Sequence, residues 1–238
     1  MVADGGAGAS TDELFASALV EIERDDGDEG PAPHLLLLLD RPTREVFERA
    51  AGLLAHDEPA QRELGARVLR ELGPRAADGS RPFRTETIAV VVAELPSEPD
   101  YWVLGCMLSV LGYHEARETL DLVLGHRSHA EQAVRFGVAA ALPALADPDR
   151  TQDRVVEALL QLAEDDDAAV RWYALYALFH ETAGIAAADR VAWATALTGR
   201  GDPERREELR HLATTFDEPV DPALRVALGG PGIGYARG

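Results

Sequence analysis

The stretch "DDDAAVRWYALYALFHE" (165–181) decides the fold, because it joins an acidic turn to an amphipathic helix that has a counterpart elsewhere in the chain. Its small and aliphatic residues fall on one side of a helical wheel, at about 100° per residue: Val170, Ala174, Ala177 and Leu178. The segment "HAEQAVRFGVAAAL" (129–142) has the same order of turn, Val-Arg pair and regularly spaced small residues. The two segments therefore predict related helices in a repeated unit.

The same spacing extends over most of the chain. Aligned on Arg62, Tyr101, Arg135, Arg171 and Arg206, five segments follow one another at offsets of 39, 34, 36 and 35 residues. Each predicted helix at these positions is preceded by another, and the preceding helices begin at Pro42, Pro82, His114, Thr151 and Ala187. Repeats of this length are typical of helical hairpins, which stack because one hairpin cannot bury its apolar face alone.

The segments "DDDAAVRWYALYAL" (165–178) and "HAEQAVRFGVAAAL" (129–142) resemble the HEAT-like repeats, a group that includes the bilin-lyase-type short repeats, and "DEPAQRELGARVLRELG" (57–73) is similar to them. The resemblance covers residues 42 to 216, or five hairpins. It implies an all-α fold, a right-handed α-solenoid of about five HEAT-like hairpins. "SEPDYWVLGCMLSVLG" (97–112) departs from the pattern, because Tyr101 stands where the other copies have Arg.

Outside the repeats, the sequence predicts three regions. Residues 1–33 are expected to be a mobile N-terminus with one helix, capped by Ser10 or Thr11, and an acidic linker. Residues 34–229 are expected to form the repeat domain, and 230–238 a disordered tail.

Composition restricts the function. The 238 residues carry a net charge of -19, which argues against binding nucleic acid through its phosphates. All 23 basic residues are Arg, and Lys and Asn are absent, which indicates the GC-rich genome of a high-GC bacterium. Cys106 is the single cysteine and is expected to be a buried thiol. "LLLLL" (35–39) is far shorter than the roughly 20 residues that span a bilayer, so we expect a cytoplasmic protein that does not enter membranes.

The candidate site is a row of aromatic residues on the second helices, which line the concave surface of a solenoid. Aligned copies place Trp102, Phe136 and Trp172 at one position, with Glu63 and Glu207 at the two ends of the row. Tyr176 flanks Trp172, while Tyr173 turns back towards the core. The rings either bind a partner or pack between repeats, since aromatic residues at helical spacing occur in both settings.

Two arginines adjoin this row. Arg135 and Arg171 have the character of anion ligands, but arginines at this repeat position also bond to turn carboxylates. On the second interpretation, Asp166 or Asp167 would serve Arg171. We count both arginines as candidate partner-binding residues.

Enzymatic alternatives find less support. His114-Glu115 and His180-Glu181 resemble the dipeptides of a HEAT-like di-iron hydroxylase family, but there are two instead of four, and their separation of 66 residues does not fit the repeat. The HEAT-like alkylpurine DNA glycosylases combine aromatics with an Asp, here from Asp165 to Asp167, but need a basic concave face. We therefore expect no metal and no cofactor.

The sequence predicts a non-enzymatic interaction scaffold or adaptor that binds a protein or peptide on its concave aromatic surface. The net charge favours a partner with a basic surface. A glycosylase acting on alkylated bases and an immunity-type inhibitor remain alternatives, and the oligomeric state is left open.

Overall fold

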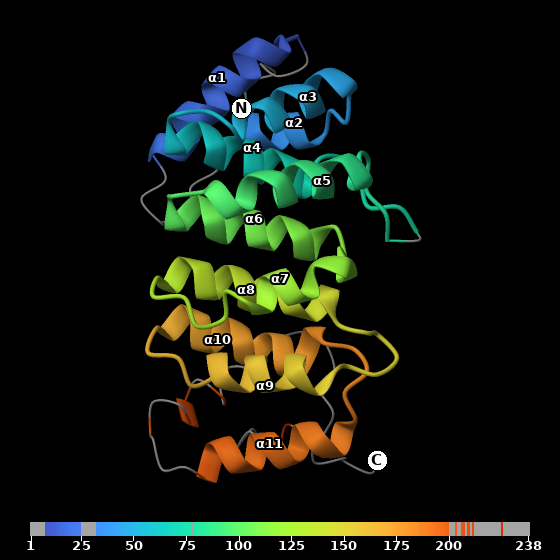
Figure 1. The fold of residues 1–238 in the computed structure, drawn as a ribbon, viewed down its shortest axis with the longest axis vertical. Coiled ribbons are helices and arrows are strands. Elements are labelled where there is room, and N and C mark those ends of the chain that lie inside the picture. Colours follow the sequence, from blue (N-terminus) through green and yellow to red (C-terminus); the bar gives the residue numbers. More distant parts are fainter. Residues whose placement is uncertain are drawn as a thin grey trace, which may run out of the picture.

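The structure is a computed structural model that describes residues 8–24, 32–77 and 79–199, together with residues 203, 206, 207, 209, 211 and 225. Every regular element in these residues is helical, which confirms the all-α class. The helices are stacked in chain order from α1 to α11 (Figure 1). Within the described part of the chain, none of them has the length and apolar character needed to cross a bilayer.

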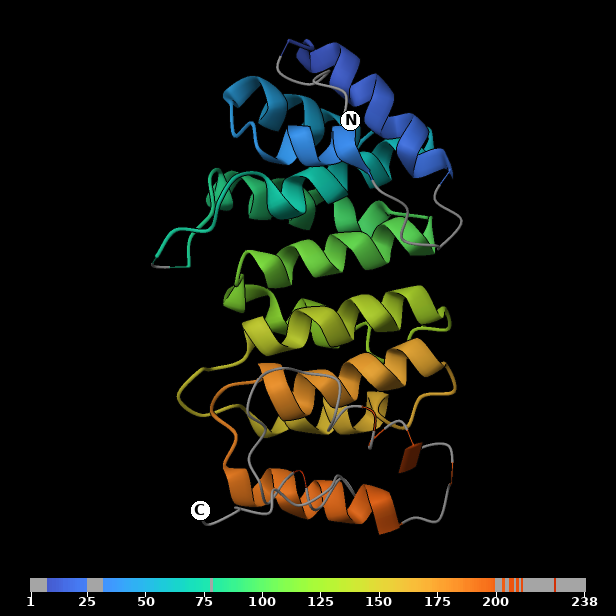
Figure 2. The same cartoon turned by 180° about the vertical axis from the view of Figure 1, so that it is seen from behind.

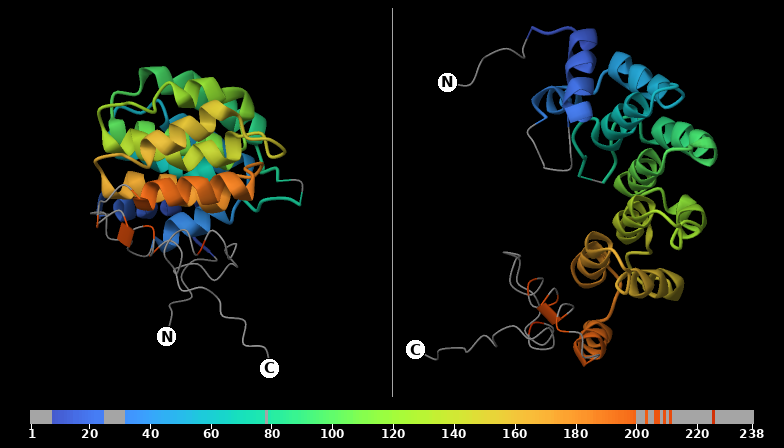
Figure 3. Two further views of the ribbon diagram at one scale, coloured as in Figure 1. Left: turned by 90° about the horizontal axis from the view of Figure 1, so that it is seen from below. Right: turned by 90° about the vertical axis from the view of Figure 1, so that its left-hand side faces the viewer.

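Two rows of helices form the stack, and the stack bends into an arc (Figure 3, right). An inner row lies on the concave side and consists of α4 (Pro59–Glu71), α6 (Tyr101–Tyr113), α8 (Gln132–Leu145) and α10 (Ala168–Tyr176). An outer row lies on the convex side and consists of α3 (Arg44–Leu53), α5 (Arg84–Glu94), α7 (Leu120–Leu124) and α9 (Asp153–Leu162). Helix α11 (Ala187–Gly199) follows at the end of the stack.

Two of the four inner helices, α6 and α10, begin at an aspartate whose side chain caps the helix. The carboxylate of Asp100 accepts the N–H groups of Trp102 and Val103, and the carboxylate of Asp167 accepts those of Ala169 and Val170. Each cap satisfies donors that a helix leaves without intrahelical partners and places negative charge at the positive end of the helix dipole. The turn chemistry read from the sequence thus fixes where these helices begin.

One predicted helix start is wrong. His114 does not open an outer helix but ends α6, and α7 follows only after a short 3-10 turn at Arg117–Thr119. The N–H of Glu115 bonds to the carbonyl of Gly112, and the N–H of Ala116 bonds to that of Leu111. This is a Schellman C-cap, and Glu115 takes its left-handed position (φ 48°) although it is not a glycine. The usual sequence signal for a helix end is therefore missing.

The inner helices approach one another through glycines. A Cβ atom on Gly105 of α6 would lie 2.4 Å from the carbonyl oxygen of Ala133 in α8. Gly65 of α4 brings an outer helix equally close, because a Cβ atom there would lie 2.6 Å from the carbonyl oxygen of Ala50 in α3. The apolar side chains of both rows then form one continuous core that runs along the stack. Val170, Ala174, Ala177 and Leu178 belong to it and are fully buried, as their helical spacing predicts.

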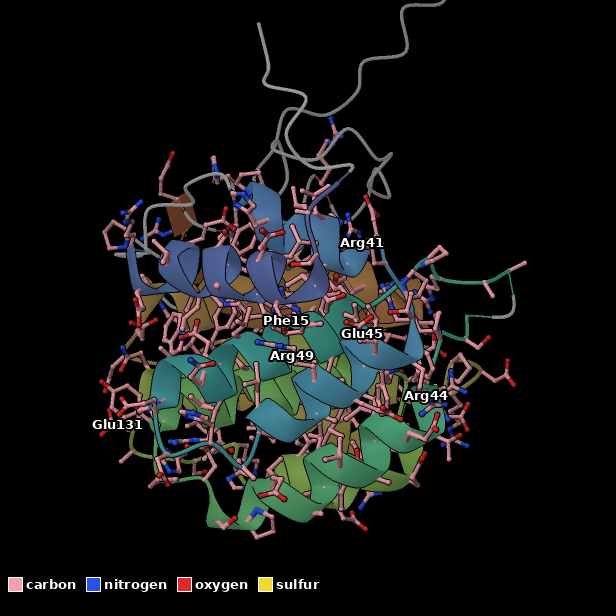
Figure 4. The ribbon with its side chains drawn as sticks, turned by 90° about the horizontal axis from the view of Figure 1, so that it is seen from above. Phe15, Arg41, Arg44, Glu45, Arg49 and Glu131 are labelled. Carbon is pink, nitrogen blue, oxygen red and sulfur yellow. The ribbon has the colours of Figure 1, made fainter. Side chains whose placement is uncertain are left out.

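The N-terminal helix is part of this core. Helix α1 (Thr11–Arg24) packs against α2 (Pro33–Leu39) and α4, and buries Leu14, Phe15, Ala18 and Ile22. In Figure 4, Arg49 of α3 lies next to Phe15, and its guanidinium carbon is 4.9 Å from the ring centre. Helix α1 therefore shares the core of the helices that follow it.

Three predictions cannot be compared in full. The N-terminal residues 1–7, the greater part of the predicted helix at 205–213 and the tail at 230–238 lie outside the described residues. Among the positions described there, Leu209 is buried.

Candidate functional site

The concave surface consists of the outward sides of α6, α8 and α10, which lie in front when the stack is seen from behind (Figure 2). Each of these helices packs against its neighbours in the inner row and against an outer helix. Their exposed side chains consequently point to the concave side. Trp102 and Phe136 are 47% and 37% exposed, whereas Trp172, Tyr173 and Tyr176 are half-buried against the core. We call these five residues the concave aromatic strip.

Charge is nearly absent from the helices that carry the strip. Helices α6, α8 and α10 have 13, 14 and 9 residues, and their charged residues are Arg135 and Arg171 alone. In the whole chain 27% of residues are charged. Aromatic enrichment with depletion of charge is the composition of the buried centre of protein interfaces.

Both arginines are held by the fold. The Arg135 guanidinium donates to both carboxylate oxygens of Asp165, from Nε at 2.6 Å and from Nη2 at 2.8 Å. Its Nη1 donates to the carbonyls of His129 and Ala130. Arg62 makes the same bonds. Its Nη1 donates to the carbonyls of His56 and Asp57, and its Nε and Nη2 donate to the carboxylate of Glu98. In both cases the carboxylate belongs to the turn that precedes the next inner helix. These bonds therefore connect each pair of outer and inner helices to the following pair.

Arg171 bonds to backbone carbonyls and not to the carboxylate that the sequence predicts. Its Nη1 donates to the backbone carbonyls of Asp165 and Asp166, at 3.0 and 2.9 Å. The carboxylate of Asp167, which we expected to serve Arg171, caps α10 instead. Arg171 is 8% exposed, which gives it a structural position and not that of a ligand on the surface.

The same arginines correct the alignment of the strip. Arg62, Arg135 and Arg171 are each the fourth residue of their helices, and in α6 the fourth residue is Leu104. Gly105, not Trp102, therefore occupies the position of Phe136 and Trp172. Trp102 lies three residues nearer the start of its helix, where its Nε1 donates to Glu63 at 2.8 Å. The expected single column of three aromatics is thus wrong in its register at α6.

The C-terminal half of the strip is a packed aromatic cluster. Phe136 of α8 meets Tyr173 of α10 edge to face, with ring centres 5.1 Å apart. Trp172 stacks on Tyr176 at 5.5 Å, and Tyr176 stacks on His180 at 5.4 Å. Burial raises the pKa of Tyr173, and Glu181 nearby acts in the same direction. The packing interpretation therefore holds for Trp172 and Tyr176, whereas Trp102 and Phe136 keep exposed ring surface.

The two His-Glu dipeptides lie near the C-terminal ends of inner helices but not in equivalent positions. His114 directly follows α6, whereas His180 lies in the π-helical segment Ala177–Glu181 that follows α10. His114 is buried, and its Nε2 lies 2.8 Å from the carbonyl of Leu69. Within the described residues, no group of three His, Cys, Asp or Glu side chains has an arrangement that could hold a metal ion.

Cys106 lies on the strip side of α6. Burial raises the pKa of its thiol to about 11, so the thiol is protonated at neutral pH. The side chain packs half-buried against the core, whereas the sequence predicts a buried thiol.

Sequence reasoning did not find a cavity of about 380 Å³ at the other side of the stack. It lies between the N-terminal parts of α9 and α11, with Asp153, Glu157, Asp189 and Trp193 in its wall. Two of these carboxylates, Asp153 and Asp189, lie in the first turns of their helices, where the helix dipole favours negative charge.

Comparison with known proteins supports the fold. The chain is similar to YibA from Escherichia coli, a structural genomics target with an X-ray structure. The match has a TM-score of 0.57 and 14% sequence identity, and covers 86% of this chain and 75% of that chain. At this identity the likeness concerns the fold alone. No protein-family model matches the chain, and no curated protein matches it.

Proposed function

We propose that the chain is a HEAT-like helical repeat protein, built as a right-handed α-solenoid of about five hairpins. Three observations support this: helices stacked in chain order (Figure 1), the Arg-to-next-turn bonds of Arg62 and Arg135, and the similarity to the fold of YibA. Stacked repeats of this kind expose an extended concave surface that binds partners.

On this scaffold, we propose a non-enzymatic interaction module that holds a protein or peptide on the concave aromatic strip. The supporting observation is the absence of charge from three consecutive inner helices, apart from two bound arginines, in a chain with 42 acidic residues. Exposed apolar surface of this kind, bordered by charge, marks interaction sites. Trp102 and Phe136 are the anchors, because they are the more exposed of its rings.

The partner should offer apolar side chains to the strip and basic groups around them. Glu63 already pairs with Arg67 and accepts Nε1 of Trp102, so the attraction of basic partners over distance rests on the net charge of -19. Steering of this kind raises the association rate more than the affinity. A cytoplasmic protein with such a partner fits both an adaptor and an immunity-type inhibitor.

A glycosylase gains no support from the strip. Such an enzyme needs positive charge facing the nucleic-acid backbone, and Arg135 of α8 and Arg171 of α10 are engaged with carbonyl groups and with Asp165.

A peptide-display experiment tests the proposal. A random peptide library is selected on the immobilised protein, and the affinities of the selected peptides are measured for the wild type and for the Trp102→Ala/Phe136→Ala variant. We expect peptides rich in apolar residues, and an affinity loss of about tenfold or more, since each anchor contributes on the order of 1–2 kcal/mol.

The control carries Val20→Ala and Leu36→Ala, which remove exposed apolar side chains from α1 and α2. Peptides that bind the control and the strip variant with equal affinity would contradict the proposed site.

A further inference from the structure

The connections that follow α4 and α6 form a basic corner on this acidic chain. Residues 70–84 and 114–117 contain five arginines and three acidic residues, while the chain as a whole carries -19. The connection from α4 to α5 projects from the edge of the stack (Figure 1). The five arginines are Arg70, Arg75, Arg81, Arg84 and Arg117.

Tyr113 lies at the centre of this corner. It is the last residue of α6 and is 39% exposed. The guanidinium carbon of Arg70 is 5.0 Å from its ring centre, and that of Arg81 is 5.8 Å away. A guanidinium held against a ring by cation–π attraction keeps N–H groups at its edge for an acceptor.

Glu115 is shared by two arginines. Arg75 and Arg117 both pair with its carboxylate, and their side chains are 55% and 50% exposed. One carboxylate cannot neutralise two guanidinium groups. Arg84 holds the Glu115 backbone in place by donating to the carbonyls of His114 and Glu115, at 2.7 and 2.9 Å.

Hydrogen-bond donors also exceed acceptors here. Arg81 donates from Nη1 to the carbonyl of Gly73 at 3.0 Å, but its Nε is buried without a partner. Buried donors without partners are uncommon in folded proteins. The carboxylate of Glu115 leaves excess positive charge at the corner, and this charge favours an anion.

We propose that this corner binds an oxyanion, a phosphate or a carboxylate group, between Arg75, Arg81 and Arg117 and beside Tyr113. The planar guanidinium fork fits both groups with two parallel hydrogen bonds. Glu115 occupies the place of the ligand in the free protein and competes with it.

The test is an NMR titration of the 15N-labelled protein with inorganic phosphate, at ionic strength kept constant with sodium chloride. The expected result is saturable shifts of the Nε–Hε signals of Arg75, Arg81 and Arg117, with the signals of Arg49 and Arg154 unchanged. A parallel titration with acetate separates the sources: saturation by phosphate alone assigns a phosphate group, and saturation by acetate as well assigns a carboxylate. Shifts that never saturate with either anion, or that are equal at all arginines, would overturn the proposal.

Two variants sharpen the result. Arg75→Ala/Arg117→Ala should weaken binding about tenfold or more, because charge-assisted hydrogen bonds are lost. Glu115→Gln should strengthen it several-fold, because the competing charge is removed, and unchanged or weaker binding would contradict the competition. Arg154→Ala is the matched control, since Arg154 is equally exposed and pairs with Asp121.

Discussion

Gly105 of α6 and Gly137 of α8 touch backbone to backbone: a Cβ atom on Gly137 would lie 2.4 Å from the carbonyl oxygen of Gly105. The two helices can approach this closely only because neither position carries a side chain. The contact lies beneath the strip and sets the spacing between Trp102 and Phe136.

Substitution Gly137→Ala should therefore destabilise the protein by about 2 kcal/mol, because the added methyl group forces α6 and α8 apart. Urea denaturation followed by circular dichroism measures the change. Gly52→Ala is the control: nothing lies within 4 Å of a Cβ atom at this helical position, so stability should rise by roughly 0.5–1 kcal/mol. Equal effects of the two substitutions would show that the helices are not in contact.

Arg135→Ala should cost about 3 kcal/mol, because it leaves the carboxylate of Asp165 without its partner in a largely buried position. The matched change Arg154→Ala removes an exposed pair with Asp121 and should cost less than about 1 kcal/mol. Thermal or urea unfolding of both variants gives the comparison, and a similar loss in the two would contradict the inter-pair role of Arg135.

The Arg135–Asp165 pair also predicts a pH dependence. Burial of Asp165 tends to raise its pKa, but hydrogen bonds from Arg135 and from the Asp167 backbone outweigh this, and its pKa is lowered. A depressed carboxyl pKa stabilises the fold above the ordinary pKa near 4, and this stabilisation is lost as the pH falls. Asp165→Asn should therefore reduce the slope of the unfolding free energy between about pH 5 and pH 3. A slope identical to that of the wild type would refute the prediction.

His114 should make the stability depend on pH in a higher range than Asp165 does. Burial lowers its pKa, although the bond to the Leu69 carbonyl opposes this, and Arg81 and Arg84 lower it further. The neutral ring is thus favoured in the folded state, so stability is full above the ordinary pKa of about 6.5 and falls below it. His114→Gln, which keeps an N–H donor, should remove this loss between about pH 7 and pH 5 in urea titrations. Persistence of the full loss in the variant would assign it to another group.

The two halves of the strip should respond differently to truncation. Trp172→Ala should cost about 2 kcal/mol, because Trp172 packs between Tyr173 and Tyr176. Trp102→Ala should cost less than about 1 kcal/mol, since it removes an exposed ring and one hydrogen bond to Glu63. Unfolding curves of the two variants decide the point, and a larger loss for Trp102→Ala would reverse the assignment of anchor and core.

Sequence periodicity predicted most of the helices, because the apolar spacing and the capping acids Asp100 and Asp167 determine where an inner helix lies. The periodicity gave wrong positions at α6, where the sequence lacks the usual signals for the repeat register and for the helix end. Tyr101 was aligned with Arg62, although Glu98 and the helix start place Leu104 there, so Trp102 was shifted by one turn. Glu115 ends α6 in a conformation usually taken by glycine.

Other features needed three dimensions. The sequence predicts that Arg135 bonds to a turn carboxylate. It does not predict that this turn belongs to the following helix pair, because that depends on how the helix pairs stack. The exposure of each ring depends in the same way on its neighbours: Phe136 and Trp172 share a helical position, yet Trp172 stacks on Tyr176.

The central claim is that the concave aromatic strip holds a partner, and the affinity of a selected peptide for the Trp102→Ala/Phe136→Ala variant tests it most directly. Isothermal titration calorimetry should show an affinity about tenfold or more below that of the wild type, in a variant that circular dichroism shows to be folded. Wild-type affinity in this variant would contradict the claim.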